Sequence, residues 1–215
     1  MEPSIVLARA ESGSSEIALR RRGEVIELVV NGVFAMDSAE VASELALADA
    51  AGTPPGRVLV AGLGLGYTTA RLLDAGAATV RVVELAEPLI TWARDGVTDQ
   101  LGRVAADPRV ELVCADIAAE LATDPGGWDA ILLDVDNGPS FLIHQHNAPL
   151  YGAAALRRCL DLLSPGGRLV IWCETASPEL ELTLRSLSSH VDVIAVPVDR
   201  EGRSFSYALY RATRG

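Results

Sequence analysis

The sequence predicts an α/β fold built on a doubly wound, mostly parallel sheet of seven strands. From residue 57 onward, strand-like and helix-like segments alternate along the chain. Several of the strand-like segments, such as residues 58–60 and 131–133, are apolar throughout, as expected for strands covered on both faces. A glycine-rich turn joins the first of them to a helix. Together these features indicate successive right-handed βαβ units in one open sheet.

The composition bounds the class of protein. A chain of 215 residues, 49% of them apolar, is long enough for one well-filled core. No apolar run approaches the roughly 20 residues that span a bilayer, and residues 1–10 lack the pattern of a secretory signal. We therefore expect a cytoplasmic protein without a membrane partner. The net charge of −11 argues against nucleic acid as a partner, because phosphate binding needs a basic surface.

Residues 1–52 are expected to form an N-terminal extension made of a short β-hairpin and a helix, followed by the main domain over residues 53–215. Residues 16–20 and 25–30 predict two strands, and Asn31-Gly32 is a strong signal for a tight turn. Ser38 is expected to cap a helix over residues 39–50. Cys114 and Cys173 lie in apolar strand-like runs, which predicts buried thiols.

The main domain is expected to begin with a strand, after which helices and strands alternate along the chain. The predicted strands are residues 57–61, 79–84, 109–114, 130–134 and 168–173, and the predicted helices are residues 67–75, 88–95, 117–123, 150–163 and 178–188. Two last strands, residues 191–196 and 204–210, follow each other without a helix, so they are expected to pair antiparallel at one edge. Exposed strand edges and the N-terminal hairpin are compatible with a homodimer.

The glycine loop is the most informative segment for function. Gly62, Gly64 and Gly66 follow a buried strand and precede a helix, so backbone N–H groups, including that of Leu63, face a ligand at close range. Glu84 ends the next strand, where a carboxylate can accept hydrogen bonds from both hydroxyls of a ribose. Dinucleotide sites favour a glycine one residue later than Gly66. The spacing therefore favours S-adenosylmethionine, or its decarboxylated form, over NAD.

Acidic residues also end the next two strands of the predicted sheet. Asp116 could accept from the exocyclic amine of adenine, with Ile117 against the ring, or it could cap the helix that follows, and the two roles are compatible. Asp134 ends an apolar strand and is expected to face the reacting end of the cofactor. In the loop after it, His144 is a candidate general base or an exposed side chain. The sequence offers no complete set of metal ligands.

At these residues the chain resembles the spermidine synthase branch of the class I S-adenosylmethionine-dependent methyltransferases, over roughly residues 25–210. Residues 60–62 resemble the start of the family's glycine loop, and residues 83–90 resemble its ribose-binding segment, which adds Leu85 to the cofactor site. Residues 114–116 resemble the adenine-binding segment. Residues 134–139 resemble the catalytic Asp-Ser-Ser-Asp-Pro motif, so the resemblance implies catalytic roles for Asp134 and Asp136.

The departures from that family bear on the reaction. Leu65 stands where the family has an Asp that contacts the amino end of the decarboxylated cofactor, and Asp136 comes one residue early. The leading hypothesis is therefore methyl transfer from S-adenosylmethionine to an amine or hydroxyl of a small molecule. Aminopropyl transfer to a polyamine is the alternative, and non-catalytic binding of an adenosine ligand is a third reading. The acidic surface is compatible with a cationic acceptor.

Overall fold

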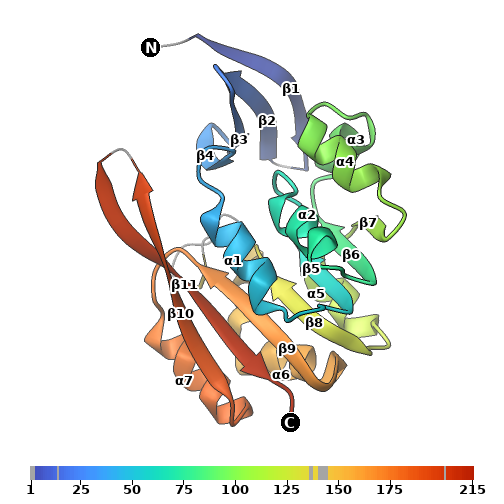
Figure 1. Ribbon diagram of the computed structural model, residues 1–215, viewed down its shortest axis with the longest axis vertical. Coiled ribbons are helices and arrows are strands. Elements are labelled where there is room, and N and C mark those ends of the chain that lie inside the picture. The colour runs from blue at the N-terminus through green and yellow to red at the C-terminus, as the bar shows by residue number, and fades with distance from the viewer. Residues whose placement is uncertain (1–2, 14, 136–137, 140–144, 201) are drawn as a thin grey trace.

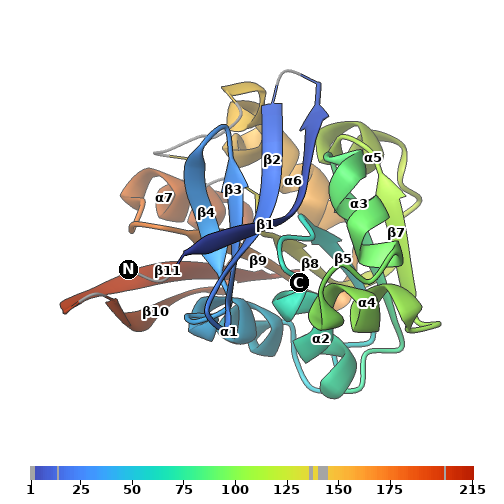
Figure 2. The ribbon, with the colours of Figure 1, turned by 90° about the horizontal axis from the view of Figure 1, so that it is seen from above.

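The computed structural model describes residues 3–13, 15–135, 138–139, 145–200 and 202–215. The chain forms two sheets (Figure 1). Sheet A is antiparallel, with its strands in chain order: β1 (Ser4–Ser12), β2 (Ser15–Arg22), β3 (Val25–Val30) and β4 (Val33–Asp37). Seen from above, it lies in front of the main sheet (Figure 2). The N-terminal extension is thus larger than the short hairpin that the sequence predicts.

The main sheet, sheet B, has seven strands in the order β10-β11-β9-β8-β5-β6-β7. Its strands are β5 (Arg57–Ala61), β6 (Thr79–Glu84), β7 (Val110–Cys114), β8 (Trp128–Leu133), β9 (Leu163–Cys173), β10 (Val191–Arg200) and β11 (Arg203–Thr213). The five strands from β9 to β7 are parallel, and β11 is antiparallel both to β9 and to β10. The doubly wound sheet and the antiparallel pair at its edge are confirmed.

Helices cover both faces of sheet B. They are α1 (Ala42–Ala50), α2 (Tyr67–Asp74), α3 (Glu87–Arg94), α4 (Asp99–Ala106), α5 (Ile117–Thr123), α6 (Ala153–Leu162) and α7 (Pro178–Leu187), with a 3₁₀ helix, η1 (Gln145–Tyr151). Val58 and Val60 of β5 pack with α1 to α4 in one core, whereas Leu59 and Ala61 pack with α5 to α7 in the other. Burial on both faces explains why the central strands are apolar throughout.

Several local predictions were wrong for identifiable reasons. No pattern in the sequence indicated β1 or α4. Helix α1 begins at Ala42, and Ser38 instead accepts a hydrogen bond from the backbone N–H of Ile26, which ties the start of the helix segment to sheet A. Cys114 is exposed rather than buried, because β7 is the edge strand of sheet B.

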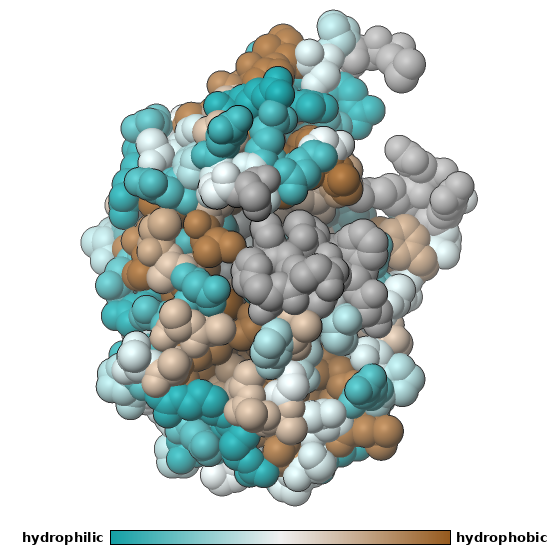
Figure 3. All heavy atoms as spheres, turned by 180° about the vertical axis from the view of Figure 1, so that it is seen from behind, coloured by the Kyte–Doolittle hydropathy of each residue, from teal (hydrophilic) through white to brown (hydrophobic). Residues whose placement is uncertain are grey.

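The described part of the chain presents a mixed surface. Hydrophilic and hydrophobic residues alternate over the face shown in Figure 3, and among its coloured residues no apolar patch spans that face. Within the same described residues, none of the helices has the length and apolarity that crossing a bilayer requires.

Candidate functional site

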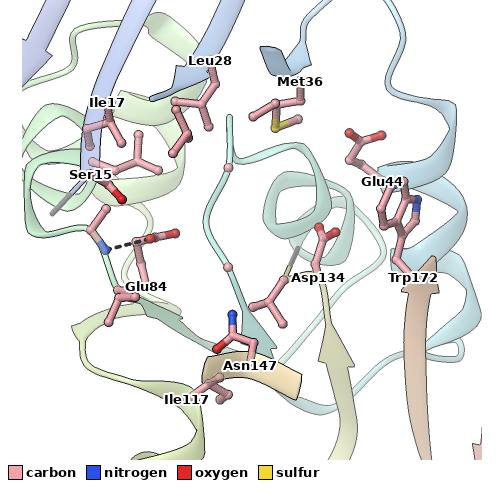
Figure 4. Close-up of a pocket in the computed structure, with 18 of the residues that line it drawn as sticks. Ser15, Ile17, Leu28, Met36, Glu44, Glu84, Ile117, Asp134, Asn147 and Trp172 are labelled. Atoms are coloured by element: carbon pink, nitrogen blue, oxygen red, sulfur yellow. Dashed lines mark hydrogen bonds between the residues drawn. The ribbon is translucent and has the colours of Figure 1, made fainter. Parts of the chain in front are cut away.

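A cavity of about 670 Å³ lies between sheet A and the carboxyl ends of the parallel strands (Figure 4). Ile17 and Leu28 line it from sheet A, and Gly62 and Asp134 line it from the ends of β5 and β8. Its volume is within the range of small-molecule sites. Its position is the one at which open α/β sheets bind ligands, beyond the carboxyl ends of their strands.

The glycine loop forms the floor of this cavity. Gly62 has a φ of 96°, and a Cβ there would lie 2.4 Å from the backbone oxygen of Asp134, so only glycine fits. Gly64 also has a positive φ, and the sulfur of Met36 lies 2.8 Å from where its Cβ would stand. Met36 accepts a hydrogen bond from the Leu65 N–H at 3.3 Å. The loop is therefore held closely between β8 and β4.

Glu84 is fixed at the edge of the loop by backbone groups. One carboxylate oxygen accepts from the N–H of Leu63 and the other from the N–H of Ala86, both at 2.8 Å. These bonds hold the carboxylate against the glycine loop at the cavity wall, where Figure 4 shows it. The carboxyl end of β6 thus presents a preorganised acceptor to the cavity.

Two further segments close the same end of the cavity. Leu85 lines it, and 45% of its surface is exposed. Ile117 also lines the cavity. Asp116 lines it as well, while its Oδ1 caps α5 by accepting from the N–H groups of Ala118 and Ala119 at 2.7 and 3.4 Å. The capping role expected for Asp116 is therefore confirmed.

Asp134 is a half-buried carboxyl at the end of β8. Its Oδ2 accepts a hydrogen bond from the Thr68 hydroxyl at 3.2 Å, and the carboxyl of Glu44, from α1, faces it across the cavity (Figure 4). Burial, followed by the nearby charge of Glu44, raises the pKa of Asp134 to about 7, against the opposing effect of the Thr68 hydrogen bond. Asp134 is therefore able to take up or release a proton near neutral pH.

This raised pKa predicts a pH-dependent stability. The unfolded chain ionises at Asp134 near pH 4 and the folded chain near pH 7, so the folded state loses stability as pH rises through that window. We expect Asp134→Asn to leave the unliganded protein's Tm almost unchanged at pH 4 and to raise it by about 3–8 °C at pH 8. Thermal unfolding of both proteins across pH 4–8 checks this. A difference in Tm that does not grow with pH would contradict it.

The other predicted site residues do not line the cavity or lie outside the described residues. Leu63 contributes its backbone N–H to Glu84 but has its side chain buried, and Gly66 packs against Val104 of α4. Asp136 and His144 fall outside the residues that the structure describes. Within those described residues, no group of three or more His, Cys, Asp or Glu side chains is placed to hold a metal ion.

Sequence reasoning missed much of the cavity wall. Its described lining contains seven carboxylates and no Lys, Arg or His; the acidic residues are Asp37, Glu40, Glu44, Glu84, Asp116, Asp134 and Glu174. Aromatic rings form another part of the wall. Trp172 of β9 stacks at a tilt on Tyr207 of β11, with centroids 4.9 Å apart, and Phe205 meets Tyr207 edge-on at 5.3 Å. The described wall is thus strongly acidic and partly aromatic.

Two spermidine synthases and a probable spermidine synthase are among the solved structures that are similar to this chain. The crystal structure of spermidine synthase from Thermotoga maritima superposes with a TM-score of 0.75 at 18% identity, over 98% of this chain and 72% of that one. A spermidine synthase in complex with the transition-state analogue AdoDATO gives 0.76 at 19% identity, over 98% and 74%. A probable spermidine synthase from Corynebacterium glutamicum ATCC 13032 gives 0.71 at 19% identity, over 97% and 80%.

The chain therefore has the spermidine synthase-like class I methyltransferase fold, as the sequence motifs indicate. No protein-family model and no curated protein sequence matches it. At 18–19% identity the similarity concerns the fold. A fold of this kind can support different reactions, so the residues of the cavity determine which reaction takes place.

Proposed function

We propose that the chain transfers an aminopropyl group from decarboxylated S-adenosylmethionine to a cationic amine. The observation that carries this proposal is the charge of the cavity: seven carboxylates and, in its described lining, no cationic side chain. Carboxylates that line a cavity stabilise a ligand that brings positive charge and repel one that brings negative charge. The decarboxylated donor carries a sulfonium and an ammonium, and a polyamine acceptor adds further ammonium groups.

The charge of the cavity favours this reaction over methyl transfer from S-adenosylmethionine. The two donors differ in one carboxylate at the amino end. In an adenosine pose based on Glu84 and Asp116, that end reaches toward Asp134 and Glu44. A third carboxylate there would meet two others, with no Lys, Arg or His in the described wall to pair with it. We therefore replace methyl transfer, the leading hypothesis from the sequence, with its alternative.

The absence of an Asp in the glycine loop does not argue against this proposal. Leu65 stands at that position, but its side chain is only 2% exposed and packs in the core between sheet B and α1 to α4. Glu44 and Asp134 line the cavity beside the loop instead. In our proposal the carboxylate of Glu44 binds the ammonium of the aminopropyl group, which offsets its loss of water, and Asp134 is left to take the proton of the acceptor nitrogen.

We assign the nucleoside end of the donor to the residues around β6 and α5. Glu84 accepts from the ribose hydroxyls, Asp116 accepts from the adenine amine, and Leu85 and Ile117 pack on the two sides of the base. Gly62 and Gly64 bring the backbone close to the donor. Of the remaining residues predicted for the cofactor site, Leu63 and Gly66 shape the loop rather than touch the ligand.

The sulfonium of a bound donor supplies both an activated carbon and a neutral leaving group. The chain's own task is to hold the acceptor nitrogen in line with that carbon and to take its proton. We assign the proton to Asp134, whose raised pKa suits it, and the acceptor's ammonium groups to the aromatic wall and Glu174. Asp136 and His144 remain predicted participants from the adjoining loop.

Product analysis tests the proposal. The protein is incubated with decarboxylated S-adenosylmethionine or with S-adenosylmethionine, each with a series of linear diamines and triamines, and products are identified by mass spectrometry. We expect 5′-methylthioadenosine and an aminopropylated amine with the first donor only. S-adenosylhomocysteine and a methylated acceptor would instead establish methyl transfer. Tight donor binding without turnover of any acceptor would support the non-catalytic reading.

A further inference from the structure

Asn147 is the only carboxamide side chain among the described residues that line the cavity. It lies on η1, and only 7% of its surface is exposed. Tyr151, at the other end of η1, donates a 2.6 Å hydrogen bond to the backbone oxygen of Val135, which fixes this short helix to the end of β8. Figure 4 shows the amide of Asn147 directed into the cavity, and Leu150 and Tyr151 of the same short helix pack in one core with Ile117. Asn147 thus stands at the end where we place the base.

The base of an adenosine ligand needs donors as well as acceptors. Its ring nitrogens accept hydrogen bonds and its exocyclic amine donates them. The carboxylates of Glu84 and Asp116 accept hydrogen bonds, and the described lining provides no Lys, Arg or His to donate. A carboxamide donates and accepts in one plane, and this is the geometry with which Asn pairs with the N6/N7 edge of adenine in nucleic acids.

We propose that Asn147 is a specificity-determining residue that selects adenine over other purine bases at this site. The inference rests on the proposed function, because that function supplies the adenosine. Hypoxanthine has a carbonyl where adenine has an amine, so its N7 edge presents two acceptors and no donor. Asn147 could then hydrogen-bond the N7 edge of hypoxanthine only by donating from its NH₂ group. The carboxylate of Asp116 would repel the carbonyl oxygen of hypoxanthine.

Calorimetry with 5′-methylthioadenosine and 5′-methylthioinosine tests this inference without turnover. The wild-type protein is expected to prefer the adenine nucleoside. In Asn147→Ala that preference should fall by about tenfold, the value of one or two neutral hydrogen bonds, while the affinity for the inosine nucleoside changes little. Asn147→Asp keeps the size of the side chain and the acceptor for the adenine amine, but it repels the carbonyl oxygen of hypoxanthine, so it should increase the preference even if Asn147→Ala folds poorly. Ala148→Ser, at the exposed next position, is the control and should leave the preference unchanged.

The possible outcomes separate this inference from the proposed function. Equal wild-type affinity for both nucleosides would overturn the inference alone. If Asn147→Ala and Asn147→Asp each reduced the affinity for both nucleosides by the same factor, the preference for adenine would be intact. That result would also overturn the inference, because Asn147 would then only shape the cavity. Failure of the wild-type protein to bind either nucleoside would overturn the proposed donor and this inference together.

Discussion

Asp134→Asn is expected to lower kcat of the proposed transfer by about 10²–10⁴-fold, the usual contribution of a general base. Asparagine has nearly the same size and can still contact the Thr68 hydroxyl, but it cannot accept a proton at neutral pH. Binding of 5′-methylthioadenosine should change far less, because its nucleoside is assigned to Glu84 and Asp116. Single-turnover kinetics with decarboxylated S-adenosylmethionine, beside calorimetry with the product nucleoside, separates the two effects.

Two further variants control this experiment. Asp161→Asn removes an exposed carboxylate of α6 that does not line the cavity, and it should leave kcat unchanged. Glu44→Gln removes the charge that helps to raise the pKa of Asp134, so the pH at which kcat/KM is half-maximal should move to lower values. A kcat within about threefold of wild type in Asp134→Asn would contradict the assignment of the proton to Asp134.

Glu84→Gln is expected to weaken binding of 5′-methylthioadenosine by about 10²-fold. An ionised carboxylate that accepts from two ribose hydroxyls makes charge-assisted hydrogen bonds, and the neutral amide replaces one acceptor oxygen with a donor. The same change affects one of the two backbone hydrogen bonds from Leu63 and Ala86, so thermal unfolding should accompany the calorimetry. The 2′-deoxy form of this nucleoside should bind the wild-type protein more weakly than the ribonucleoside does. Glu84→Gln should reduce the affinity for the 2′-deoxy form by a smaller factor than the affinity for the ribonucleoside.

Glu87→Gln is the matched control for Glu84→Gln. Glu87 lies three residues further on, in the first turn of α3, and it is exposed and outside the cavity. Its substitution should leave the dissociation constant within about twofold of wild type, as is usual for exposed charges. Equal losses in the two variants, or none in Glu84→Gln, would contradict the role of Glu84 in ribose binding.

Part of the cavity lining could be predicted from the sequence, for a physical reason. Four of the lining residues stand at or just after the carboxyl ends of parallel strands: Gly62, Gly64, Glu84 and Asp116. The carboxyl ends of such strands lie together at one edge of the sheet. The local sequence is enough to predict these positions, because each apolar strand and the residue that follows it are contiguous in the chain. The seven-stranded sheet was predictable for the same reason, since each strand is a contiguous segment with several apolar residues between turn or helix signals.

The part of the cavity wall that α1, β9 and β11 form could not be predicted in the same way. Glu44 lies on a helix that also carries an exposed carboxylate, Asp49, so nothing in its local sequence marks it as facing Asp134. Trp172 and Tyr207 come from different strands and meet only because β11 pairs with β9. Leu65 was misleading for a related reason: its position in the motif suggested a lost ligand contact, but its side chain belongs to the core. Such relationships depend on tertiary packing rather than on spacing along the chain.

The most direct test of the account is a calorimetric comparison of decarboxylated S-adenosylmethionine with S-adenosylmethionine. The two ligands share adenosine and sulfonium and differ in one carboxylate, so they report on the charge of the cavity near Asp134 and Glu44. We expect the decarboxylated form to bind at least about tenfold more tightly, a difference that corresponds to about 1.4 kcal/mol. Equal affinity, or tighter binding of the carboxylated form, would contradict the claim that this cavity selects cationic ligands.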